Sequence, residues 1–199
     1  MFGRLPHCDD LFLRFFDPWY NEADRKRRKF RATRPDMMQV PELVGVSEAT
    51  TAPLPDAECA KTRQQLDAML SAARGDWPVY LSVSGEVEFP WIDVFDRYWD
   101  RKRIKGIIQS SDAKDFGNDY VITVCEFGAV LGHVMRGLQP RLLWNFERPY
   151  WESALVDPRT GFVIPVFHWA IKKMSGYGVD DGFAAKVQAC LRALEDGGK

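Results

Sequence analysis

Cysteine and histidine are the residues best suited to nucleophilic, acid–base or metal chemistry, and this chain has few of either. The four cysteines and three histidines are Cys8, Cys59, Cys125, Cys190, His7, His133 and His168. The cysteines are widely separated without a C-x-x-C pair, and no two histidines have the spacing of a zinc motif. We therefore expect reduced thiols, no metal site, no cofactor and structural histidines.

Cys125 is the strongest candidate nucleophile. It ends the β-branched run from Tyr120 to Cys125, which predicts a strand, and a helix is expected over 127–138 directly after it. A helix N-terminus lowers the pKa of a thiol, so this placement would favour a thiolate. However, no protease or hydrolase signature surrounds Cys125, and a cysteine in an apolar run is more often a core residue. A small cytosolic enzyme that uses Cys125 is therefore an alternative, and we expect no catalytic residues.

The glycines that follow Cys125 do not form a phosphate-binding loop. The segment from Glu126 to Gly132 lacks G-x-G-x-x-G and a Lys-Ser/Thr ending, and the carboxylate of Glu126 would repel phosphate. Gly128 and Gly132 are four residues apart and share one face of the expected helix. We expect this face to pack closely on a sheet.

The run from Arg25 to Arg31 is the best candidate for binding nucleic acid. Six of its seven residues are basic, and Phe30 could stack on a base. Acidic residues directly upstream, among them Asp17 and Glu22, would pair with it at helical spacing. The chain also has a net charge of −1 and a pI of about 6.3, whereas nucleic-acid binders usually carry a basic excess. An accessory nucleic-acid-binding protein is a second alternative.

Acidic and aromatic side chains gather around one predicted helix, and we expect them to bind a protein partner. Trp91, Phe95 and Trp99 recur every fourth residue, which predicts an amphipathic helix over 90–103. An acidic surface speeds association with a basic partner. The predicted partner-binding residues are Glu86, Glu88, Trp91, Asp93, Asp96 and Asp100.

The remaining pattern predicts an α+β fold: a mixed, mostly antiparallel sheet with helices packed on it, in a single domain. Helices are expected over 56–74, 165–174 and after Asp180 or Asp181, and strands over 78–84, 141–146, 151–156 and 162–164. Residues 112–118 and 157–161 read as a loop and a turn. We divide the chain into residues 1–54, a helical arm and irregular connection, and residues 55–199, an α/β core domain, which together form one structural unit.

Length and composition agree with one globular unit. The chain has 199 residues, of which 46% are hydrophobic, so it can bury a sizeable core. We find no signal peptide and no run of 18 apolar residues, and therefore expect a cytoplasmic protein that does not enter a membrane.

The C-terminal half resembles a group of small bacterial α/β proteins. The resemblance is carried by the helix from Glu126 to Val134, Trp144, the segment from Glu152 to Leu155 and the run from Ile164 to Lys173. It covers roughly residues 119 to 176. Where the group often has an acid after the second glycine, this chain has His133.

Some proteins of that group look like immunity proteins encoded beside polymorphic or secretion-system toxins. The resemblance implies no catalytic residues. Together with the missing catalytic motifs, it leads us to expect a non-enzymatic binding protein, an immunity or antitoxin protein that binds and neutralises a toxin domain.

Overall fold

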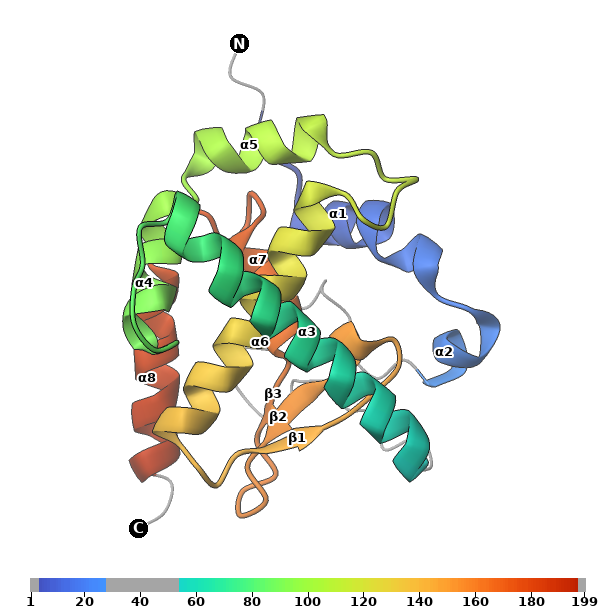
Figure 1. Cartoon of the computed structure of the whole chain (residues 1–199), viewed down its shortest axis with the longest axis vertical. Helices are drawn as coiled ribbons and strands as arrows, with labels where there is room; N and C mark the ends of the chain where they lie inside the picture. Colours follow the sequence, from blue (N-terminus) through green and yellow to red (C-terminus); the bar gives the residue numbers. More distant parts are fainter. Residues whose placement is uncertain (1–3, 28–53, 197–199) are drawn as a thin grey trace.

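The structure is a computed structural model, and it describes residues 4–27 and 54–196. Within these residues the chain forms eight α-helices and one three-stranded antiparallel sheet (Figure 1). Helix and sheet are both present, as the α+β expectation requires, but the fold is mostly helical because the strands are only two or three residues long.

Two short 3₁₀ helices complete the set of elements in residues 4–27 and 54–196. In chain order the elements are α1 (Cys8–Phe15), η1 (Asp17–Trp19), α2 (Glu22–Arg27), α3 (Asp56–Tyr80), α4 (Phe89–Tyr98), α5 (Arg101–Ser110), α6 (Asp119–Leu138), β1 (Leu143–Asn145), η4 (Tyr150–Glu152), β2 (Ala154–Val156), β3 (Val163–Ile164), α7 (Val166–Lys173) and α8 (Phe183–Asp196). The strand order is β1-β2-β3, with Leu155 opposite both Trp144 and Ile164. In Figure 1, α3 crosses in front of α6 and the sheet lies below that crossing.

The central element is α6, and the strand predicted over 120–125 is wrong. Residues Asp119–Leu138 form one continuous helix, which Asn118 caps by accepting a hydrogen bond from the Val121 amide at 3.0 Å. Most of its side chains are buried between α3, α7 and the sheet, so no polar face marks a helical period. By length and composition α6 could also cross a membrane, but 72% of its apolar window is buried inside this fold, as in the core helix of a soluble protein.

The two glycines on one face of α6 let aromatic rings approach its backbone. A methyl group at Gly128 would lie 2.3 Å from Cδ1 of Phe167 on α7. A methyl group at Gly132 would lie 2.4 Å from the ring of Trp144 on β1. The predicted close packing is therefore present, against the sheet at Gly132 and against a helix at Gly128.

Two further elements differ from the prediction. No strand forms over 78–84, because α3 continues to Tyr80 with Pro78 in its last turns. Trp77 holds this end in the core: its indole stacks on Phe95 at 4.9 Å and its Nε1 donates to Glu126 at 2.9 Å. The single helix predicted over 90–103 is two helices, α4 and α5, which are separated because Asp100 caps the second one.

The N-terminal helix α1 is part of the main hydrophobic core. Leu11, Phe12 and Phe15 are fully buried. The ring of Phe15 lies 4.6 Å from that of Tyr120 on α6, and Phe12 stacks on His168 of α7 at 5.6 Å. The residues before α2 therefore pack directly on the two central helices.

Candidate functional site

The predicted partner-binding residues do not form one surface, because two of them lie inward. Trp91 is 3% exposed and stacks on Trp77 at 5.9 Å. Asp96 forms an ion pair with the buried ammonium of Lys173 and accepts a hydrogen bond from the Ala184 amide at 3.1 Å. Trp91 therefore packs α4 on α3, and Asp96 joins α4 to α7 and α8.

The other four acidic residues lie at the surface. Asp93 pairs with Arg97 at 2.7 Å, as a pair one helical turn apart. Asp100 accepts a hydrogen bond from the Arg103 amide at the start of α5, and this bond lowers the pKa of its carboxyl group. Glu86 and Glu88 are exposed just before α4.

Cys125 does not lie where a strand meets a helix. It is fully buried in the middle of α6, and burial raises the pKa of its thiol to about 12. The helix N-terminus that was expected to lower this pKa lies six residues earlier, at Asp119. The structural basis for an enzyme that uses Cys125 is therefore lost.

The described part of the basic run is paired with carboxylates. Arg25 pairs with Asp17 at 3.1 Å and Lys26 with Glu22 at 2.8 Å, as the upstream acids predicted. Arg27 contacts Glu147 at 3.1 Å. Residues 28–31 lie outside the described residues.

A surface recess that the sequence did not predict brings together four distant parts of the chain. It has a volume of about 700 Å³ and lies between η1 and α2, the first turns of α3, Phe116 in the segment before α6, and the segment from Arg148 to Trp151. This volume lies in the range of small-molecule sites. We call this site the recess; its lining residues include Trp19, Asp24, Glu58, Lys61, Phe116, Arg148, Tyr150 and Trp151.

Aromatic rings form one side of the recess. Trp19 and Phe116 meet edge to face at 5.2 Å, and Phe116 lies 5.3 Å from Trp151. Trp19 is 36% exposed, whereas Trp151 is nearly buried. The recess therefore offers a Trp ring on its rim and a second one in its wall.

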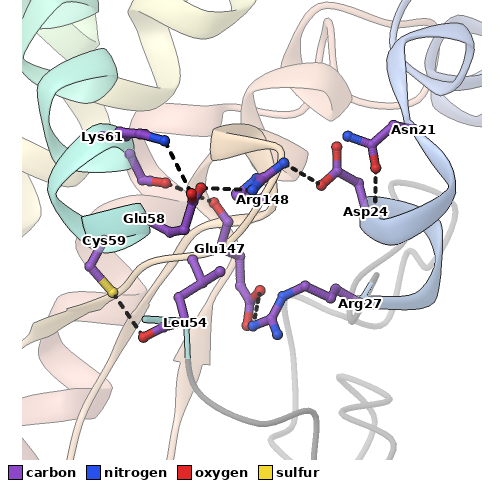
Figure 2. Close-up of polar contacts among 10 residues, drawn as sticks. Asn21, Asp24, Arg27, Leu54, Glu58, Cys59, Lys61, Glu147 and Arg148 are labelled. Carbon is purple, nitrogen blue, oxygen red and sulfur yellow. Dashed lines mark hydrogen bonds and ion pairs between the residues drawn. The ribbon is translucent and has the colours of Figure 1, made fainter. Parts of the chain in front are cut away.

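Charged side chains form the other side, and Figure 2 shows the contacts among them. Arg148 lies between two acids: Nη1 donates to Glu58 Oε2 at 2.7 Å, and Nη2 lies 3.4 Å from Asp24 Oδ1. Lys61 donates to the other oxygen of Glu58 at 3.2 Å. The hydrogen bonds from Lys61 and Arg148 lower the pKa of Glu58, so this carboxylate is ionised at neutral pH.

Local hydrogen bonds hold the charged wall in place. Asn21 caps α2 by accepting a hydrogen bond from the Asp24 amide at 2.8 Å. Glu147, next to Arg148 in the chain, is buried, and its carboxylate accepts a hydrogen bond from Arg27 at 3.1 Å (Figure 2). The Glu147 amide donates to Ser153 Oγ at 2.9 Å. These bonds tie α2 to the segment before η4.

A buried polar chain lies behind the aromatic wall. Trp151 Nε1 donates to the hydroxyl oxygen of Tyr20 at 3.0 Å, and that hydroxyl donates to Glu152. The second oxygen of Glu152 lies 3.1 Å from Nε2 of His168. Glu152 and His168 are each 1% exposed, so this arrangement orients Trp151 and does not present an acid–base pair to solvent.

His7, Cys8 and Asp9 are the one group of potential metal ligands that the described residues bring together. They are consecutive in the chain, and the Asp9 amide donates to His7 Nδ1 at 3.4 Å, which caps α1. Burial raises the pKa of Cys8 to about 12. The Cys8 thiol is therefore protonated, and the His7 imidazole already accepts a hydrogen bond. Both observations favour a role in capping α1 over metal binding.

Comparisons with protein-family models, with curated proteins and with solved structures found no significant match for this chain.

Proposed function

We propose that this protein is a non-enzymatic binding protein that neutralises a toxin domain, as an immunity protein does, and that the recess receives an anchoring side chain of this partner. The observation that carries the proposal is the lining of the recess. Trp19, Tyr150, Trp151 and Arg148 meet there in a concave surface. Trp, Tyr and Arg are the residue types most enriched at the energetic centres of protein interfaces.

The rigidity of the recess supports this proposal. Trp151 is oriented by the buried chain through Tyr20 and Glu152, and Arg148 is held between Asp24 and Glu58. A pre-ordered surface loses little side-chain entropy on binding, so more of the contact energy remains as affinity. A stable interface buries about 800 Å² on each partner and would therefore extend beyond the recess.

The positions of the groups that could do chemistry agree with a binding role. Cys125 is buried with a high thiol pKa, and the only close His–Glu pair among the described residues, His168 and Glu152, is enclosed in the core. Because a substrate would not reach either group in this fold, the exposed recess is the better candidate for function.

The experiment is co-expression of this protein with the product of the neighbouring gene in its own genome. We expect that product to arrest growth alone and the full-length protein to restore growth and co-purify with it. Trp19→Ala is expected to weaken the complex by about 30-fold, as for a loss of roughly 2 kcal/mol at an interface centre.

The matched control is Val79→Ala, which shortens a side chain that is 83% exposed at the end of α3, away from the recess. It is expected to bind like the wild type. A neighbouring product that is harmless, or a Trp19→Ala variant that binds and protects as well as Val79→Ala, contradicts the proposal.

A further inference from the structure

A second concave surface lies on another part of the molecule, between α3, the end of α6 and β1. Two hollows of about 320 and 460 Å³ share the residues Leu66, Asp67, Arg136 and Trp144, so they are continuous. We call this surface the groove. None of its described lining residues belongs to the recess.

One wall of the groove is an edge strand. β1 pairs with β2 on one side and is the first strand of the sheet, so its other edge has no strand partner among the described residues. The larger hollow lies between β1 and α3, and Leu143 at the start of β1 is 53% exposed. An edge strand of this kind presents backbone N–H and C=O groups that can pair with an added strand.

The floor of the groove is aromatic. Trp144 of β1 and Phe146, directly after β1, have near-parallel rings whose centroids are 6.2 Å apart. The ring of Trp144 packs against the backbone of α6 at Gly132. The guanidinium of Arg63 lies over the ring of Phe146, 5.3 Å from its centroid. The rings are therefore held in place and half-buried.

Two arginines on the groove form no ion pair with any carboxylate of the described residues. They are Arg63, on the ring of Phe146, and Arg136, whose Nε donates to the Leu142 carbonyl at 3.2 Å. Elsewhere Arg97, Arg103 and Arg148 each contact a carboxylate at 2.7 Å. A guanidinium that is oriented but unpaired is suited to bind an incoming carboxylate in two-pronged geometry.

The other titratable groups of the groove leave it positively charged. Asp67 lies one turn from Arg63 on α3 and supplies one negative charge against two guanidiniums. His133 lines the smaller hollow, where burial and the nearby charges of Arg74 and Arg136 lower its pKa, so its ring is neutral at neutral pH.

We infer that the groove binds an extended, acidic segment of a protein partner, which pairs with the free edge of β1 and places carboxylates on Arg63 and Arg136. This inference rests on the proposed function, because the same partner would supply the segment. The observations favour a peptide over nucleic acid: the groove borders an open strand edge, and its two arginines are accompanied by Asp67 in a chain of net charge −1.

The test is a selection from a phage library of random octapeptides on the immobilised full-length protein. We expect the selected peptides to alternate apolar residues with Asp or Glu. The best peptide, synthesised with a fluorescein label, is expected to bind at least tenfold more weakly to the Arg63→Gln/Arg136→Gln variant. The control is Arg97→Gln/Arg103→Gln, which removes two exposed charges from α4 and α5 and is expected to bind within twofold of the wild type.

Strand pairing is tested with backbone N-methylation of the selected peptide. Methylation of alternate amides removes donors from one edge of an extended peptide, so one of the two possible methylation series is expected to abolish binding and the other to preserve it. Equal binding of both series overturns the inference, as does a selection without acidic excess or without dependence on the two arginines. The inference is also overturned if the protein selects no peptide but binds a labelled decathymidylate in a way that depends on the two arginines.

The result is independent of the toxin experiment. Trp19→Ala lies outside the groove and is expected to bind the selected peptide like the wild type. A failed peptide selection therefore leaves the recess experiment standing, and a failed recess experiment does not alter the peptide result.

Discussion

Glu126 is a carboxyl group enclosed in the centre of the molecule. It is 3% exposed and accepts one hydrogen bond from Trp77 Nε1 at 2.9 Å. Burial raises the pKa of this group to about 7, whereas its ordinary value is 4.5. The folded protein therefore binds a proton on Glu126 that the unfolded chain has released at the same pH.

The sign of the resulting pH dependence follows from this difference. Between pH 4.5 and 7 the folded state holds more protons at Glu126, so its free energy of unfolding falls as the pH rises. The full contribution is present below pH 4.5 and is lost above pH 7. It amounts to roughly 3 kcal/mol for a shift of this size.

Glu126→Gln keeps an acceptor for Trp77 and cannot ionise. We expect the variant to match the wild type near pH 5 and to be more stable at pH 8 by roughly 2–3 kcal/mol. Urea denaturation across this pH range measures both proteins. If the difference in free energy of unfolding between the variant and the wild type stays constant from pH 5 to 8, Glu126 is not the group responsible.

At the residue scale, the sequence predicted which side chains share an apolar face, but it did not predict the partners of the charged residues beside that face. The spacing of Trp91, Phe95 and Trp99 correctly predicted one apolar face. It did not show that Asp96, next to that face, would meet a buried Lys173 that lies 77 residues later. In the sequence, an acidic residue near other acidic residues looks like a solvent-exposed one. Only the folded structure shows that it pairs with a distant basic residue.

At the scale of elements, the approach of aromatic rings to α6 depends on two glycines. Gly128→Ala and Gly132→Ala would place a methyl group within 2.3–2.4 Å of the rings of Phe167 and Trp144. Because both rings are packed, we expect each variant to be destabilised by roughly 1–3 kcal/mol in chemical denaturation.

Gly137 supplies the control on the same helix. A methyl group there meets nothing within 4 Å, so Gly137→Ala is expected to be neutral or to stabilise by up to about 1 kcal/mol through helix propensity. If the three alanine variants changed the stability equally, the role of Gly128 and Gly132 would not be to let the aromatic rings approach α6.

The predicted elements succeeded where local chemistry determines the structure. The turn at 157–161, the strand that follows it and the helix after Pro165 were predicted, because a turn sequence and a proline mark their ends. The strand predicted over 151–156 is correct only for Ala154–Val156, because Tyr150–Glu152 form the 3₁₀ helix η4. The strand at 120–125 failed because a helix that is buried on all sides has no polar stripe. The strand at 78–84 failed because the packing of Trp77 continues α3 past Pro78.

At the scale of the whole molecule, the N-terminal helix is a structural part of the core. Phe12→Ala would empty a fully buried position against α7 and is expected to cost about 3–5 kcal/mol. Leu13→Ala, at the next residue and 58% exposed, is expected to cost about 0.5 kcal/mol or less. Urea denaturation followed by both near- and far-ultraviolet circular dichroism measures the two variants.

A single coincident transition is expected for both variants, because α1, α6 and α7 share one core. If Phe12→Ala instead produced an early transition confined to the N-terminal residues, α1 would be an independent attachment. The recess could not be predicted at this scale, because it joins Trp19, Glu58, Phe116 and Arg148, which no sequence motif connects.

The position of α6 in the chain also has a consequence for synthesis on the ribosome. Its apolar surface is complete at Leu138, but α7, which covers one side of it, ends 35 residues later at Lys173. For that interval the growing chain presents a segment with the length and hydropathy of a membrane span. The nascent protein is therefore expected to engage the cell's chaperones for exposed hydrophobic segments until α7 emerges, whatever its finished form binds.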